Sequence, residues 1–320
     1  MDALSEVFAA VRLSGGVFLD AEFTAPWCVV SQVGPEDFSA QGGMPAHLIA
    51  YHYVVAGRLF VEVQGTPPLE VRAGEIVLLP RNDRHLLAST PGLPPVVIAG
   101  EVQAPDATAP AVLRHGGGGE ATRIVCGYLG CDAPHNPLIA TLPSLLSLEM
   151  GSHATGAWIE SSFRHAAEEF AQGGAGSAAV LGKLAELLFV EAVRRYLAAM
   201  PAGQTGWLAG LQDRRIGRAL ALLHTRVAHP WTTEELAREV GLSRSAFAER
   251  FTALLGAPPM HYLAGWRLQL AALRLRDSAA STAQIAWDVG YESDAAFNRA
   301  FKRTFACTPA AWRRQGAPAR

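Results

Sequence analysis

The sequence has few of the features that mark secreted or membrane proteins. Its 320 residues include only four cysteines, too few for a disulfide scaffold, so we expect a protein of the reducing cytoplasm. No run of 18 apolar residues is free of charges and chain breakers, which argues against a membrane-spanning helix. Residues 1–16 have no basic segment ahead of their apolar stretch, so no signal peptide is predicted.

Charged residues are also scarce, at 18% of the chain, and they are unevenly distributed. Residues 213–320 contain 16 Lys and Arg against 9 Asp and Glu, whereas residues 1–212 contain 11 against 20. A basic segment beside an acidic body indicates that one module binds a polyanion. Solvated helix faces would give the same imbalance, so charge alone does not establish a nucleic-acid partner.

The apolar pattern changes once along the chain. Residues 17–130 contain short runs of Val, Leu and aromatics, such as 47–57, separated by Gly and Pro, as in all-β barrels and sandwiches. Beyond them, apolar residues recur at helical spacing and predict helices over 137–150, 154–172 and 178–200. The last of these is apolar around more than one face, so we expect it at a homodimer interface, with burial inside one chain as the alternative.

Residues 231–256 have the pattern of a helix-turn-helix. Thr232 or Thr233 is placed to cap the first helix, and Ser243 to cap the second. Between them, Gly241 stands where the tight turn needs a positive φ.

Residues 281–314 repeat this pattern, with Gly290 at the turn and Ser293 as the cap of the second helix. In both copies the second helix carries two aromatics at i, i+4 that face inward: Phe247 and Phe251, then Phe297 and Phe301. A helix predicted over 260–277 joins the copies. Two copies on one linker helix are far more specific than a single helix-turn-helix pattern.

The segment 213–314 resembles the AraC/XylS family of transcription regulators. The resemblance rests on "LAREVGLSRSAFAERFTALLGAPPMHYL" and "IAWDVGYESDAAFNRAFKRTFACTPAAWR", and it covers about a third of the chain. It implies two helix-turn-helix units whose recognition helices enter two successive major grooves of double-stranded DNA. RNA polymerase is the further partner that such a regulator implies.

The resemblance also assigns the DNA contacts. Base edges would be read by Arg244, Ser245 and Glu249 in the first unit and by Asp294, Asn298, Arg299 and Lys302 in the second. Phosphates would be contacted by Arg250, Arg303 and the helix starts at Ser243 and Ser293. Glu249 and Asp294 have an alternative role as salt-bridge partners that orient the arginines.

Residues 72–87, "RAGEIVLLPRNDRHLL", resemble the second motif of cupins, with His85 as the motif's histidine. The preceding residues 52–65 resemble the strand that follows the first motif. Residues 1–135 therefore resemble the cupin-type sensor found in many such regulators, which implies a double-sheet β-barrel that senses a small effector, a metal or an oxidant.

The usual metal ligands of cupins are missing from this sequence. The glutamate position of the first motif falls on Ala50, and no His-x-His pair precedes it. A cupin dioxygenase or isomerase with a DNA-binding tail is therefore the competing interpretation. We expect no enzyme, because the sequence also lacks a Gly-rich phosphate loop and a Ser-His-Asp arrangement.

Four residues remain as a candidate zinc set: His52, His85, Cys126 and Cys131. Such a zinc ion would be either regulatory or purely structural. Cys126 and Cys131 are an odd number of residues apart, so a straight strand puts them on opposite faces unless its glycines bulge it. Two alternatives stay open: the cysteines fill the core, or Cys126 and Cys131, with or without Cys28, form an oxidant-sensing set.

These observations predict an α+β chain: an N-terminal cupin-like β-barrel followed by helices, and a C-terminal all-α domain with two helix-turn-helix units. The predicted divisions are a sensor domain over 1–135, a helical dimerisation region and linker over 136–205, and a DNA-binding domain over 206–320. The predicted function is a one-component, homodimeric transcription regulator.

Overall fold

The computed structural model places most of the chain in two compact units. The described residues are 3–11, 13–34, 45, 47–96, 102–103, 111–131, 137–149, 154–201 and 203–316. The sheet unit consists of residues 13–134 and 142–196, and the helical unit of residues 1–12, 135–141 and 197–320. This division differs from the expected one, because most of the predicted dimerisation region belongs to the sheet unit and the N-terminal helix belongs to the helical unit.

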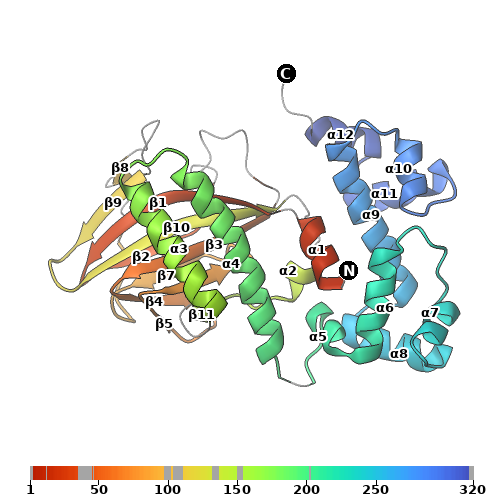
Figure 1. The fold of residues 1–320 in the computed structure, drawn as a ribbon, viewed down its shortest axis with the longest axis horizontal. Helices are drawn as coiled ribbons and strands as arrows, with labels where there is room; N and C mark the ends of the chain where they lie inside the picture. Colours follow the sequence, from red (N-terminus) through yellow and green to blue (C-terminus); the bar gives the residue numbers. More distant parts are fainter. Residues whose placement is uncertain are drawn as a thin grey trace. The chain divides into compact units, whose positions relative to one another are not determined.

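Within the described residues, the sheet unit contains a seven-stranded sheet of order β11-β6-β3-β10-β1-β9-β8 and a four-stranded sheet of order β2-β7-β4-β5 (Figure 1). The strands are β1 (Ser14–Thr24), β2 (Cys28–Ser31), β3 (His47–Ala56), β4 (Arg58–Val63), β5 (Leu69–Arg72), β6 (Glu75–Leu79), β7 (His85–Ala88), β8 (Val102–Gln103), β9 (Ala111–Gly116), β10 (Ala121–Cys131) and β11 (Leu146–Glu149). The predicted β-rich N-terminal domain is confirmed.

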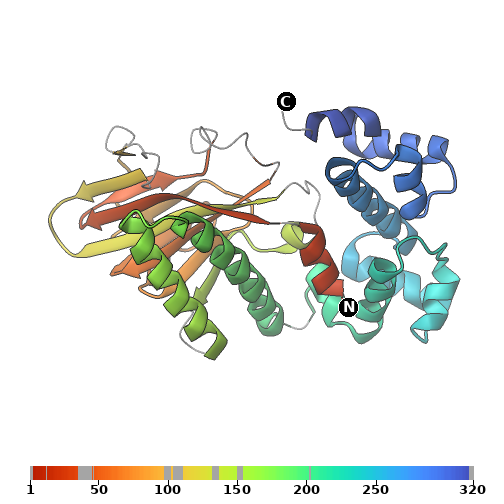
Figure 2. The ribbon, with the colours of Figure 1, turned by 45° about the horizontal axis from the view of Figure 1, so that its top comes forward.

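Helices α3 (Ala154–Ala171) and α4 (Ser177–Ala199) lie across one face of the seven-stranded sheet (Figure 2). Tyr51 and Tyr53 of β3 pack their rings against Phe163 of α3, at centroid distances of 6.2 and 4.7 Å. Gly15 of β1 and Gly182 of α4 approach so closely that a Cβ on either would overlap the other's backbone. The seven-stranded sheet is thus covered on both sides, which explains why β3 is an apolar run rather than an alternating one.

The helix expected over 137–150 is wrong in its second half. The chain forms only the short α2 (Pro137–Thr141) and then β11, which pairs antiparallel with β6. Leu146 and Leu148 are buried while Ser147 and Glu149 are exposed. This alternation has the period of a strand. The helical spacing seen over residues 137–150 as a whole does not hold for these four residues, which pair with β6 instead.

The helical unit contains the two predicted helix-turn-helix units. Its helices are α1 (Ala3–Val11), α2, α5 (Trp207–Gln212), α6 (Arg214–Thr225), α7 (Thr233–Glu239), α8 (Arg244–Leu255), α9 (Pro259–Asp277), α10 (Thr282–Asp288), α11 (Asp294–Phe305) and α12 (Pro309–Gly316). The first unit is α7–α8, the second is α10–α11, and α9 joins them. Helix α1 packs against α6. None of the helices in the described ranges is long and apolar enough to cross a membrane.

Local chemistry explains both turns. Thr232, Ser243 and Ser293 are N-caps whose side chains each accept a hydrogen bond from a backbone N–H three residues on. Gly241 and Gly290 have φ values of 68° and 88°, which confirms the expected left-handed turns. A side chain at Gly290 would also strike the Arg267 guanidinium.

Candidate DNA interface and sensor site

Helices α8 and α11 bury one side and expose the other. The four predicted inward aromatics, Phe247, Phe251, Phe297 and Phe301, are fully buried. All the predicted DNA-contact residues are exposed: Ser243, Arg244, Ser245, Glu249, Arg250, Ser293, Asp294, Asn298, Arg299, Lys302 and Arg303. The exposed side of each recognition helix is therefore polar and begins at a capped N-terminus, as a groove-binding helix requires.

Arg250 is already engaged within the helical unit. Its Nε donates to the Asp213 carboxylate at 2.7 Å, and Asp213 also caps α6 by accepting from the backbone N–H groups of Arg215 and Ile216. Burial opposes the charged form of Asp213, but these hydrogen bonds keep its pKa below the usual value. Arg250 thus ties α8 to α6, and its phosphate contact stays a prediction.

The other predicted contacts are not held in this way. Asn298 donates to the Asp294 carbonyl at 2.8 Å. Neither Glu249 nor Asp294 forms an ion pair with an arginine in the part of the chain that the structure describes, so the orienting role expected for them is not visible. The cations of Arg299 and Lys302 likewise make no ion pair there, which leaves them available to a polyanion.

Arg267 on the linker helix α9 fixes the two helix-turn-helix units relative to each other. Its guanidinium donates to the carbonyls of Val227 and His229, just before α7, at 2.9 and 2.7 Å. It also donates to the carbonyl of Gly290, in the turn of the second unit, at 3.0 Å. Sequence analysis missed this residue, because nothing in a helix pattern distinguishes an arginine that reaches two turns.

A buried aromatic stack forms the core below the first unit. His224 stacks on Trp266 at a centroid distance of 4.2 Å, and Tyr262 donates to His224 Nε2 at 2.7 Å while accepting from Trp207 Nε1. Within the described residues, His224 Nδ1 has no hydrogen-bond partner. Burial lowers the pKa of His224 to about 3, so the ring is neutral in the folded protein.

In the sheet unit, three of the four predicted zinc ligands come together. His52 of β3 lies directly opposite Cys126 of β10 in the strand register, and His52 Nδ1 is 3.0 Å from Cys126 Sγ. His52 Nε2 is 2.7 Å from His85 Nε2, and His85 Nδ1 is 2.8 Å from the Asp83 carbonyl. The exposed fractions are 1% for His52, 2% for His85 and 3% for Cys126. We call this series the Cys126 chain.

The direction of every hydrogen bond in the Cys126 chain follows from its last acceptor. Burial, and then the neighbouring His85, keeps the pKa of His52 well below its usual value, and burial also lowers the pKa of His85, so both rings are neutral. The Asp83 carbonyl only accepts, so His85 donates from Nδ1 and accepts at Nε2. His52 then donates from Nε2 and accepts at Nδ1, and the Cys126 thiol is the donor at the other end.

The four-residue zinc set is not assembled. The β10–β3 ladder runs without a shift from Ile124 to Cys131, so the glycines do not bulge β10 and Cys131 faces away from Cys126. Cys126 lies at the Nδ1 edge of His52, whereas His85 lies at the Nε2 edge, so one ion cannot contact all three side chains. In the described ranges, no group of three or more His, Cys, Asp or Glu has a metal-binding arrangement.

The predicted oxidant-sensing set is separated as well. Cys28 of β2 lies in the other sheet, beside outward-facing Glu62, Leu86 and Ala88. Its neighbour Val29 belongs to the core between the sheets, so the Cys28 side chain is on the outer face of the four-stranded sheet. None of the four cysteines forms a disulfide, and Cys126 lies beside the ring of His52.

A two-sheet unit and a helical unit with two exposed recognition helices define a DNA-binding transcription regulator. A profile of the cupin family matches residues 2–198, and a profile of helix-turn-helix domains matches residues 236–315. The chain belongs to the AraC-like transcription regulators, with a cupin as its N-terminal domain.

Two curated relatives align with most of this chain, and a solved structure aligns with about a third of it. An AraC-like transcription regulator of Streptomyces antibioticus is 29% identical over 99% of this chain and 100% of its own. Another, of Streptomyces lividans, is 32% identical over 83% of this chain and 87% of its own. The crystal structure of an AraC-type regulator from Chromobacterium violaceum is 29% identical, covers 32% of this chain and 92% of its own, and has a TM-score of 0.31. The two Streptomyces relatives are transcription regulators, in agreement with the prediction that the chain is not an enzyme.

Proposed function

We propose that this regulator is a cytoplasmic homodimer that changes its DNA binding when a hydroperoxide oxidises Cys126. The observation that carries the proposal is the Cys126 chain, because its hydrogen bonds all point one way, from the thiol toward the Asp83 carbonyl. RNA polymerase is the partner expected at the bound promoter.

The chain of hydrogen bonds supports formation of a thiolate inside the sheet unit. The Cys126 proton passes to His52 Nδ1 while the His52 Nε2 proton passes to His85 Nε2. The positive charge then rests on His85, whose charged form is opposed by burial and favoured by the Asp83 carbonyl and carboxylate, and His52 remains neutral. Charge separation in this buried site is costly, and the Asp83 groups offset part of that cost.

The oxidation itself balances without a second thiol. The Cys126 thiolate attacks one oxygen of the hydroperoxide, the S–O bond forms, and the O–O bond breaks. His52 gives its Nδ1 proton to the leaving oxygen while His85 returns a proton to His52 Nε2, so the products are a sulfenic acid and water or an alcohol. Cys131 and Cys28 lie on other faces, so we expect a sulfenic acid rather than an intramolecular disulfide.

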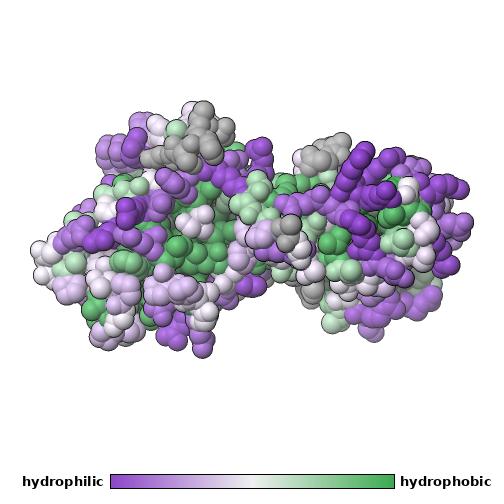
Figure 3. Space-filling model, turned by 90° about the horizontal axis from the view of Figure 1, so that it is seen from below, coloured by the Kyte–Doolittle hydropathy of each residue, from purple (hydrophilic) through white to green (hydrophobic). Residues whose placement is uncertain are grey.

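The exposed side of α3 and α4 supports the homodimer. Val180 and Leu187 of α4 are 48% and 38% exposed, and Trp158 of α3 is 60% exposed. Val180 and Leu187 are two turns apart and share one side of α4. Figure 3 shows a hydrophobic area on the sheet unit, at the left of the view, whereas hydrophilic residues cover most of the helical unit. A second copy of the same helix would cover such a side.

The test uses the full chain, reduced and then treated with hydrogen peroxide. A DNA fragment selected from a random pool reports binding at fixed salt, and a sulfenic-acid-trapping reagent with mass spectrometry reports the site. Cys126→Ser should abolish the change in DNA affinity, whereas the matched control Cys131→Ser should keep it. A response that survives in Cys126→Ser would sink the proposal.

Metal analysis of the same sample tests the competing zinc interpretation. One zinc per chain, lost together with His52→Ala and His85→Ala, would make the two Nε2 atoms metal ligands and would contradict the hydrogen-bond chain. Wild-type protein without zinc that still forms the Cys126 sulfenic acid supports the oxidant response.

A further inference from the structure

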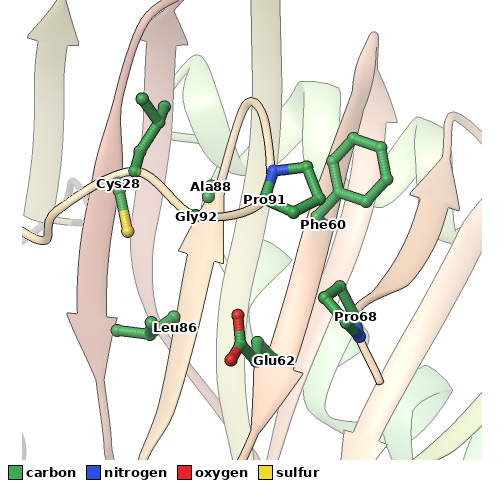
Figure 4. Close-up of a pocket in the computed structure, with 9 residues that line it drawn as sticks. Cys28, Phe60, Glu62, Pro68, Leu86, Ala88, Pro91 and Gly92 are labelled. Atoms are coloured by element: carbon green, nitrogen blue, oxygen red, sulfur yellow. The ribbon is translucent and has the colours of Figure 1, made fainter.

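A pocket lies on the outer face of the four-stranded sheet (Figure 4). The core between the sheets is filled by side chains such as Leu59, Val61 and Leu87. Along β4, Phe60 and Glu62 alternate with these and therefore point outward. They line a pocket of about 160 Å³ together with Cys28, Leu86 and Ala88, and the loop through Pro91 borders it.

The pocket opens toward a larger neighbour. A second pocket, of about 320 Å³, shares Glu62 and Leu86 with the first and extends to Arg84 and His85. The carboxylate of Glu62 therefore stands where the two meet. An occupant of the smaller pocket would have its polar end at Glu62 and its body against the apolar wall.

The residues that line the smaller pocket indicate what kind of small molecule would bind there. Phe60, Leu86 and Ala88 are apolar, and Glu62 is the charged side chain. Burial, and then Glu62 itself, raises the pKa of the Cys28 thiol, so this thiol stays neutral. In the part of the chain that the structure describes, no side chain donates a hydrogen bond or ion pair to the Glu62 carboxylate. A half-buried carboxylate without such a partner is suited to a cation from outside.

We propose that this pocket binds a small organic cation, a protonated primary amine on an apolar group, with the ammonium on Glu62 and the apolar group on Phe60, Leu86 and Ala88. Neither Glu62 nor Phe60 belongs to the Cys126 chain, although the adjoining pocket borders His85. The amine gives the sheet unit a second input, a reversible ligand beside a covalent signal.

Calorimetric titration of the full chain with three ligands of one shape tests the charge. The ligands are 2-phenylethylamine, the neutral 2-phenylethanol and the anionic 3-phenylpropionate. The amine should bind at least tenfold more tightly than the alcohol, and the anion should bind most weakly. Glu62→Gln should remove the difference between amine and alcohol, and the fold should persist because the carboxylate has no partner to lose.

The control variant is Glu22→Gln, which removes an exposed carboxylate from the other sheet, where Glu22 pairs with Arg114. It should keep the preference for the amine. Phe60→Ala removes the ring from the apolar wall and should weaken the binding of the amine and of the alcohol alike, which gives the position of binding. Equal binding of amine and alcohol, a preference that survives in Glu62→Gln, unchanged binding in Phe60→Ala, or no saturable amine binding at millimolar concentration would each overturn the proposal.

Discussion

The buried His224 makes the stability of the helical unit depend on pH in a calculable way. In the folded protein its pKa is about 3, against 6.5 in an exposed histidine. The folded pKa is depressed, so the neutral ring contributes fully above pH 6.5, and this contribution is lost as the pH falls from 6.5 toward 3. At pH 5 the folded ring is still neutral, so the loss is set by protonation of the unfolded state.

That loss follows from the 1.5 pH units between 5 and 6.5. At about 1.4 kcal/mol per unit, the free energy of unfolding should be about 2 kcal/mol lower at pH 5 than at pH 8 because of His224 alone. The physical cause is burial: Trp266 and Tyr262 pack around the ring, and no carboxylate among the described residues is paired with it.

Urea unfolding followed by tryptophan fluorescence measures this effect, since Trp207 and Trp266 adjoin the ring. His224→Phe removes the titrating group and keeps a ring of similar size. The variant will be less stable at pH 8, because Tyr262 loses its acceptor, but its pH dependence between 8 and 5 should be smaller by about 2 kcal/mol. Wild type and His224→Phe with the same pH dependence would refute the reasoning.

Three further predictions concern the DNA interface and the dimer. Arg299→Ala should weaken specific DNA binding by about 1–3 kcal/mol at fixed salt, measured by fluorescence anisotropy. Substitution of the exposed Arg114 by Ala is the control and should leave the affinity unchanged. An unchanged affinity in Arg299→Ala would contradict the role of α11 as a recognition helix. Arg267→Met leaves the carbonyls of Val227 and His229, just before the first unit, and of Gly290, in the second, without their donor. Stability should therefore fall by about 2–3 kcal/mol and affinity at least tenfold, and urea unfolding and DNA binding, measured separately, check the two effects. Leu187→Glu should give a monomer in analytical ultracentrifugation, whereas Ala178→Glu, half a turn around α4, should stay dimeric.

Much of the helical unit follows from local sequence. The caps Thr232 and Ser243, the turn at Gly241 and the inward pair Phe247 and Phe251 each depend on a few neighbouring residues, so one segment contains all the information needed. The roles of Arg267 and His224 were not predicted, because they do not depend on neighbouring residues. Their roles depend on partners about 25 to 40 residues away, which periodicity does not encode.

The sequence was enough to predict that the N-terminal unit is rich in β-strands, but not which residues of neighbouring strands lie opposite each other. His52 and Cys126 are neighbours only because β3 pairs with β10 across 74 residues of sequence. The sequence therefore predicted three residues that the structure brings together, His52, His85 and Cys126. It also predicted Cys131, whose side of the sheet depends on whether β10 bulges. That β10 stays regular is a property of its pairing with β3, and a single sequence contains no direct sign of it.

The Cys126 chain of hydrogen bonds is close to the helices of the proposed dimer interface. These hydrogen bonds run from one sheet to the other, since His52 and Cys126 lie in the seven-stranded sheet and His85 lies in the four-stranded one. Tyr51, next to His52, packs against α3 on the outer face. An oxygen added to Cys126 must displace His52 or its strand, because the interior is close-packed.

If that displacement changes the affinity of the dimer, the oxidised chain has a different dimer dissociation constant from the reduced chain. We therefore expect sedimentation equilibrium to give different dissociation constants for wild type before and after treatment with a hydroperoxide, with the sulfenic acid at Cys126 confirmed by trapping. Cys126→Ser should give the same constant before and after treatment. Identical constants for reduced and oxidised wild type would show that the signal at Cys126 does not reach α4, and the response would then have to act on DNA binding by another route.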